Sequence, residues 1–210
     1  MKAENGQLLF YAQGDAFADG RYDLRVVEAL LTEYRRIMDA SLPLAYHQNT
    51  MSGRLRNQVT YEVEFREGSL GAVVDFVLNH HDEIAAVIAS SEVTREYLAE
   101  FICNTIDGIL KLRRLAQKML EKGEKPSIRL SNSGDNSQLA SLSDVTVHKG
   151  NILVNPIIII AAESTRPSLD RLLAQVNGKS VGKLDIKSAK SETAIRPQDI
   201  EVAPQICTAR

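Results

Sequence analysis

The feature that most constrains this chain is a long amphipathic pattern over residues 94–122. Apolar side chains recur there at steps of three and four residues, which is the spacing of one face of an α-helix. The members of this inner face are Leu98, Phe101, Ile102, Thr105, Ile109, Leu112, Ala116, Met119 and Leu120. Gly123 follows as a typical residue to end a helix. The pattern predicts one long helix with a broad buried face.

The N-terminal region predicts a strand followed by a second helix. The apolar run at residues 7–12 is typical of a buried strand. Asp23 is expected to cap a helix whose apolar stripe runs through the side chains at positions 24, 27, 31, 34 and 38. Pro43 is expected to end that helix, because a proline ring cannot continue it. Residues 44–54 show no regular period and are expected to form a loop.

The clearest strand pattern lies at residues 59–66, where apolar and polar side chains alternate. A period of two places one face of a strand in the core and the other in water. Glu67-Gly68-Ser69 predicts a turn, and residues 70–78 predict the returning strand of a hairpin. A helix that starts near Ser69 is the competing interpretation of residues 70–78.

The remaining segments predict short elements. Residues 82–90 favour a short helix. Residues 144–148 and 152–154 predict a hairpin around Lys149-Gly150-Asn151. Residues 157–162 and 166–176 predict two helices, and Thr165 is expected to cap the second. Two further strands are expected at 181–187 and 200–203. The Ser-rich and Gly-containing stretch at 124–143 predicts a surface loop or a joint.

This order of elements predicts an α+β fold, with an antiparallel or mixed sheet packed against several helices. The strands and helices do not alternate as they do in a doubly wound sheet. We expect an N-terminal α+β domain at residues 1–123, a loop or joint at 124–143 and a C-terminal α+β subdomain at 144–210. Packing of both parts as a single domain is the alternative.

Composition excludes several classes of protein. The 210 residues are 44% hydrophobic and carry 25 basic and 27 acidic side chains, a formal net charge of −2. These values are typical of a globular chain and not of a disordered one. The longest apolar run is far shorter than the roughly 18 residues that a membrane span needs, and the first residues do not resemble a signal peptide. With only Cys103 and Cys207, we predict a cytoplasmic protein without a disulfide framework.

A group of aspartates follows the first predicted strand. Asp15, Asp19 and Asp23 lie at a place where divalent ions often bind, but Phe17 and Val26 occupy ligand positions of an EF-hand, which excludes that motif. Asp15 and Asp19 are therefore the candidate metal ligands of a metal-dependent hydrolase or phosphoryl-transfer enzyme. The structural alternative is that the three aspartates satisfy turns and cap a helix.

Other catalytic patterns are incomplete. Gly178-Lys179-Ser180 lacks the preceding glycine of a phosphate-binding P-loop, since Leu173 stands there. The run from His80 to Glu83 lacks the spacing of a zinc motif and fits a solvated helix start. Cys103 falls near an apolar helix face, where cysteine usually acts as a small apolar residue. No cofactor is predicted.

The best candidate for a functional surface is a basic stripe on the long helix. Its members, spaced by three and four residues opposite the apolar face, are Lys111, Arg114, Lys118 and Lys122, with Lys125 beyond them. Such a stripe can bind an acidic protein or follow nucleic-acid phosphates. Cations near a helix C-terminus are also favoured by the helix dipole, so a plain solvated face is the structural alternative.

Short turn motifs give the N-terminal third a resemblance to a known group of proteins. They are Gly14-Asp15-Ala16, Asp23-Leu24 and Glu67-Gly68-Ser69-Leu70. In these motifs the chain resembles a loosely defined family of uncharacterised bacterial and phage proteins. The resemblance implies a strand that ends in a Gly-Asp-Ala turn before a helix, and brings no activity with it. Many members are longer, which is consistent with a truncation at Arg210.

These observations favour a non-enzymatic protein-interaction or assembly module of a bacterial or phage-related system. Its partner is expected to be another protein or a second copy, bound by Lys111, Arg114, Lys118 and Lys122. The metal-dependent enzyme built on Asp15 and Asp19 and nucleic-acid binding through the basic stripe are the two alternatives.

Overall fold

The structure is a computed structural model, and it describes residues 3–20, 22–46, 52–66, 70–78, 93–131 and 142–199. Its centre is a five-stranded antiparallel sheet in the order β2-β3-β1-β7-β8. The strands are β1 (Gln7–Gln13), β2 (Val59–Arg66), β3 (Leu70–Leu78), β7 (Lys183–Lys187) and β8 (Glu192–Ile195). Because β7 pairs with β1, residues on both sides of the 124–143 segment share one sheet.

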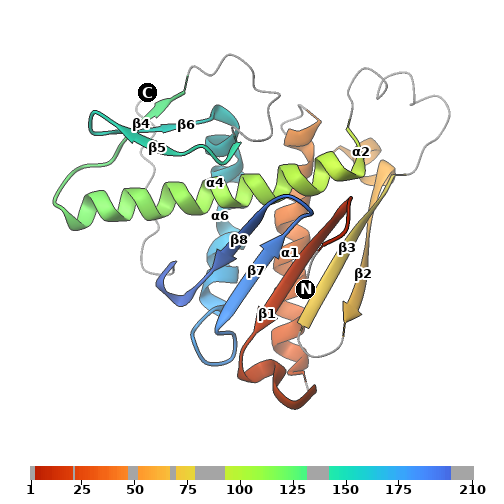
Figure 1. Cartoon of the computed structure of the whole chain (residues 1–210). Coiled ribbons are helices and arrows are strands. Elements are labelled where there is room, and N and C mark those ends of the chain that lie inside the picture. The colour runs from red at the N-terminus through yellow and green to blue at the C-terminus, as the bar shows by residue number, and fades with distance from the viewer. Residues whose placement is uncertain are drawn as a thin grey trace.

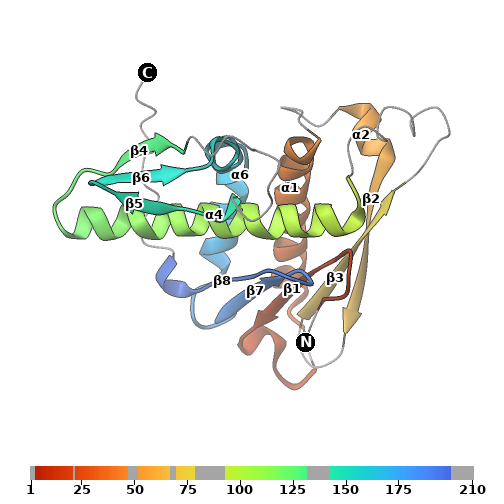
Figure 2. The same ribbon diagram turned by 45° about the horizontal axis from the view of Figure 1, so that its top comes forward.

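Three long helices pack on one face of this sheet: α1 (Leu24–Ala45), α4 (Arg95–Glu121) and α6 (Pro156–Gln175). Figure 1 shows α1 and α6 behind the sheet, with α4 crossing both of them, and Figure 2 shows the same crossing from a second angle. Glu33 of α1 is buried and accepts a hydrogen bond from Arg171 of α6 at 2.8 Å. The buried apolar side chains of the helices and of the inner face of the sheet form one continuous core.

The strand pattern explains which face is buried. Leu8, Phe10 and Ala12 of β1 are fully buried and belong to the core beneath the helices. Phe10 stacks on Tyr34 of α1, with ring centroids 4.1 Å apart. The α+β class predicted from the sequence is confirmed.

A second, smaller sheet lies beside α4 in the order β4-β6-β5. It consists of β4 (Ser127–Leu130), β5 (Thr146–His148) and β6 (Asn151–Val154), with β4 parallel and β5 antiparallel to β6. Lys149 and Gly150 join β5 to β6 with φ angles of 48° and 77°. Two successive positive φ angles are the signature of a type I′ hairpin turn.

Most predicted elements are present near their predicted positions. Residues 70–78 form a strand, so the competing helix is wrong. Asp23 caps α1 through its side chain as predicted, and the hairpin at β5 and β6 is confirmed. The predicted turn at 67–69, helix at 82–90 and strand at 200–203 lie outside the described residues.

Two helix predictions are wrong in detail. Pro43 does not end α1, which continues to Ala45 because Leu44 and Ala45 are buried against the core. The region predicted as two helices around Thr165 is the single helix α6. There the Thr165 hydroxyl donates to the carbonyl of Ala161 at 2.7 Å instead of capping a new helix. Burial on both sides of the expected break keeps the helix continuous.

One short α-helix and two short strands were not predicted. A helical turn, α2 (Gly53–Gln58), replaces the end of the expected 44–54 loop, capped by Ser52. Strand β4 lies within the stretch predicted as loop or joint, and β8 follows β7. Each has only four to six residues, too few for a periodic pattern to stand out.

The Gly14-Asp15-Ala16 turn has a packing role. The backbone N–H groups of Asp15 and Ala16 donate to the carbonyls of Lys179 and Ser180 at 3.2 and 3.0 Å. A Cβ atom on Gly14 would collide with the Ser180 carbonyl oxygen, and its φ of 151° is unfavourable for other residues. The turn therefore fixes the loop before β7 to the end of β1.

Candidate interaction surface

Helix α4 connects the body of the molecule to the region that carries the basic stripe. The Thr94 hydroxyl accepts from the Tyr97 N–H at 3.1 Å and starts the helix. Its apolar face is buried as far as Met119, and the helix ends at Glu121, with Lys122 as its C-cap before Gly123, which has a φ of +75°. The last turns extend beyond α6 together with the small sheet, as Figures 1 and 2 both show.

The first two cations of the predicted stripe are used inside the fold. Lys111 pairs with Asp107 one turn earlier at 2.8 Å and donates to the Ser143 carbonyl at 3.2 Å. Arg114 binds both carboxylate oxygens of Asp199 at 2.7 and 2.9 Å and donates to the Ala194 carbonyl at 2.7 Å. Arg114 thus joins α4 to β8 and to the short 3-10 helix η2 (Pro197–Asp199).

The Asp199 carboxylate is 4% exposed at its side chain. Burial alone would raise its pKa, but hydrogen bonds from Arg114 and from the Arg196 backbone N–H outweigh burial, so the pKa of Asp199 is lowered. The bidentate geometry is the strong form of an arginine–carboxylate pair. Arg114 is therefore a structural residue, although the stripe pattern grouped it with the surface lysines.

Lys118 and Lys122 are exposed and make no ion pair with a described residue. They lie near three further exposed cations in what we call the basic tip, residues 117–131 and 146–151. The five cations of the basic tip are Lys118, Lys122, Lys125, Arg129 and Lys149, against the two carboxylates of Glu121 and Glu124. The chain as a whole carries a net charge of −2, so positive charge is concentrated at this end.

The basic tip also exposes aliphatic side chains. Leu120, Leu130 and Val147 are 46%, 57% and 49% exposed, and they are three of the six large apolar side chains exposed in the described residues. Leu130 and Val147 flank Val154 and Ile152 of β6, which are fully buried. The small sheet therefore buries one face of its central strand and leaves apolar side chains exposed on both outer strands.

The candidate metal ligands stand at a different place. Asp15 is exposed at the start of the short 3-10 helix η1 (Asp15–Gly20), while the side chain of Asp19 is outside what the structure describes. Asp23 accepts from the Arg25 N–H at 2.9 Å, as the structural alternative predicted. Within the described ranges, no group of three or more His, Cys, Asp or Glu side chains is placed to hold a metal ion.

Cys103 is fully buried on α4, and its thiol lies 3.6 Å from the Ile186 carbonyl oxygen. Burial raises the pKa of this thiol to about 12. A thiol with such a pKa holds its proton near neutral pH and is a poor nucleophile. Cys103 is a packing residue in this fold.

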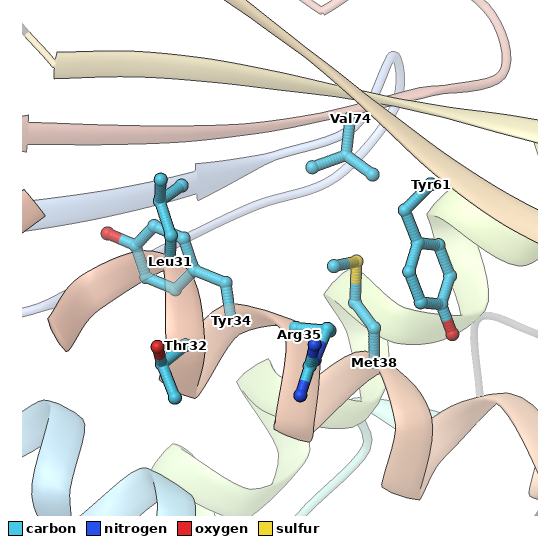
Figure 3. A pocket seen from close by; sticks show the side chains of 7 residues that line it. All are labelled: Leu31, Thr32, Tyr34, Arg35, Met38, Tyr61 and Val74. Carbon is cyan, nitrogen blue, oxygen red and sulfur yellow. The ribbon is translucent and has the colours of Figure 1, made fainter. Parts of the chain in front are cut away.

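Described residues line two hollows in the body of the molecule. A polar hollow of about 410 Å³ surrounds Arg114 and is lined by Asp107, Glu192, Thr193, Ala194 and Arg196. An apolar hollow of about 310 Å³ lies between α1 and the sheet (Figure 3). Sequence reasoning missed both, since each joins side chains from elements that are far apart in the chain.

The fold and this surface define an α+β protein with three helices on one face of an antiparallel sheet and a basic tip at one end. Among the described helices, none combines the length and the apolar character that a membrane crossing requires. Comparison with protein-family models, with curated proteins and with solved structures gives no match.

Proposed function

We propose that this protein is a non-enzymatic interaction module that binds an acidic protein surface through the basic tip. The observation that carries the proposal is the coincidence of five exposed cations, none of which has an ion pair with a described residue, with three exposed aliphatic side chains at one end of a chain of negative net charge. Exposed apolar groups that lie together typically mark a binding surface, whereas scattered ones do not. The resemblance in the N-terminal turns favours a bacterial or phage origin, and the low cysteine content favours the cytoplasm.

The composition of the basic tip favours a protein over a nucleic acid. Proteins that bind single strands stack bases on aromatic side chains between their cations. The tip contains no Phe, Tyr or Trp, and its exposed carbon is aliphatic, in Leu120, Leu130 and Val147. Aliphatic side chains gain free energy when a protein partner removes them from water. Lysines around them supply the complementary charge for an acidic partner.

The decisive experiment places a photo-activated crosslinking amino acid at Lys122 and, separately, at Lys149, in cells that express the chain. The control positions are Arg25 and Lys179, which are also exposed but lie outside the basic tip. We expect a protein adduct of one defined mass from the tip positions alone. The adduct formed from position 149 should disappear when Lys118→Glu and Lys122→Glu are combined in that chain.

Three other outcomes of the crosslinking would overturn the proposal. Adducts that nuclease digestion removes would identify nucleic acid as the ligand and overturn the proposal. Equal labelling from the tip and control positions, or none from either tip position, would do the same. Light scattering coupled to size exclusion then separates two kinds of partner. A native mass well above 23.2 kDa that falls on the double charge reversal identifies a second copy, and a monomer identifies a different protein.

A further inference from the structure

The apolar hollow beside α1 has a graded lining. Its inner wall is made by side chains that are almost fully buried, namely Tyr34, Met38 and Val74. Its rim is made by partly buried or exposed side chains, namely Leu31, Thr32, Arg35 and Tyr61. Figure 3 shows Leu31, Met38, Tyr61 and Val74 on several sides of an open space between α1 and the strands. The hollow is therefore apolar inside and open to water at one side.

The described lining of this hollow has few polar groups, and these differ in charge and in hydrogen bonding. The Tyr61 hydroxyl donates to the Asp39 carboxylate at 3.1 Å. Burial and Asp39 raise the pKa of Tyr61, so its ring is a neutral wall. In Figure 3 the Tyr34 hydroxyl points away from Met38 and Tyr61. Arg35 is exposed and forms no ion pair with a described residue, Asp39 included. Arg35 is thus the one unpaired charge on the described lining.

We propose that this hollow binds a small amphiphilic carboxylate, whose hydrocarbon chain fills the apolar interior and whose carboxylate pairs with Arg35. Apolar walls favour a hydrocarbon over a polar ligand, because only the hydrocarbon gains from leaving water. A guanidinium at the rim favours a carboxylate head, which it can bind by two hydrogen bonds. The volume of about 310 Å³ is at the small end of ligand pockets, which selects a medium-length chain.

The proposal is independent of the basic tip. The hollow is formed by α1, β2 and β3, whereas the tip is formed by the end of α4 and the small sheet, and these groups lie at different ends of the molecule in Figures 1 and 2. Failure of either proposal leaves the other unaffected.

The test measures the binding of octanoate by titration calorimetry and by methyl NMR shifts of Met38. Octanol and octylamine are the matched probes, because they share the chain and differ in the charge of the head. We expect saturable octanoate binding that shifts the Met38 methyl signal, with octanol weaker and octylamine weakest. Arg35→Glu should raise the octanoate Kd about five- to tenfold and leave octanol unchanged.

Arg25→Glu is the matched control, since Arg25 is an exposed arginine of the same helix outside the hollow and without an ion pair to a described residue. It should leave the octanoate Kd unchanged. Leu31→Phe adds bulk at the rim and should reduce the binding of both octanoate and octanol; a variant that fails to fold is replaced by the Arg35→Glu comparison. No Met38 shift with octanoate, equal Kd values in Arg35→Glu and the parent, or tighter binding of octylamine would each overturn the proposal.

Discussion

Leu112 and Leu120 lie two turns apart on α4, yet Leu112 is fully buried and Leu120 is 46% exposed. Arg114 and Lys118 lie one turn apart, yet Arg114 is tied to Asp199 and Ala194 while Lys118 has no described ion pair. The same spacing of apolar and basic side chains therefore continues along α4 from a buried environment into an exposed one. The body of the molecule surrounds the first part of this helix, whereas among the described elements only the small sheet lies beside its end. The role of a side chain here depends on which distant elements reach it.

The largest expected effect on stability comes from replacing leucine by alanine at two positions of α4, one in each environment. Leu112→Ala should lower the free energy of unfolding by about 3 kcal/mol, because it removes a fully buried side chain and leaves a cavity. Leu120→Ala should change it by less than about 1 kcal/mol, because nearly half of that side chain is already in water. Urea unfolding followed by circular dichroism measures both. Equal losses would show that the tip packs as tightly as the body.

A glycine inside α4 gives the next effect. A Cβ atom on Gly108 would lie 2.5 Å from the Leu142 carbonyl oxygen and 2.8 Å from Cδ1 of Ile158. Gly108→Ala should therefore cost about 2 kcal/mol through overpacking, although alanine favours helices. Gly53→Ala is the control, since that helical glycine has open space around it and the change should stabilise by about 0.5 kcal/mol. Thermal unfolding should show shifts of opposite sign, and two shifts of the same sign would contradict the close packing at Gly108.

The Arg114–Asp199 pair predicts a pH dependence. Asp199→Asn should cost about 1.5 kcal/mol, a value reduced because Arg114 is partly exposed. The pKa of Asp199 is lowered in the fold, so this stabilisation is present above the ordinary carboxylate pKa of about 4 and is lost as the pH falls through the lower folded value. Glu121→Gln, at an exposed position of the same helix, should have almost no effect. Unfolding curves at pH 7 and pH 3 measure both, and a loss in Asp199→Asn that is as large at pH 3 as at pH 7 would argue against the charge pair.

The fold was predictable from the sequence where patterns are long. The 3.6-residue period over residues 94–122 and the alternation at 59–66 require several repeats of one spacing, and both elements are present. The helix cap Asp23 was predictable because its hydrogen bond is local. Elements of three to six residues, such as β4, β8 and α2, offer too few positions for a period, and their pairing depends on distant strands.

The candidate surface was predictable only in part. The spacing of Lys111, Arg114, Lys118 and Lys122 identified one side of a helix correctly, but it could not show that Arg114 meets Asp199, which lies 85 residues away in sequence. Arg129 and Lys149 join the basic tip through strand pairing, which no local pattern reveals. The apolar hollow combines α1 with β2 and β3 in the same way. Local spacing does not predict contacts between residues that are far apart in the sequence.

The smallest expected effect on stability is the sharpest test of the basic tip. Combining Lys118→Glu and Lys122→Glu should lower the free energy of unfolding by about 1 kcal/mol at most, because exposed cations near a helix C-terminus gain only a modest dipole contribution. Arg114→Glu should cost more, since it places a like charge against buried Asp199. If the tip binds an acidic partner, the double variant loses the crosslinked adduct while its unfolding curve barely moves. A double variant that unfolds as readily as Arg114→Glu would instead mean that these lysines stabilise the fold. The distinction between structural cations in the body and partner-binding cations in the basic tip would then be wrong.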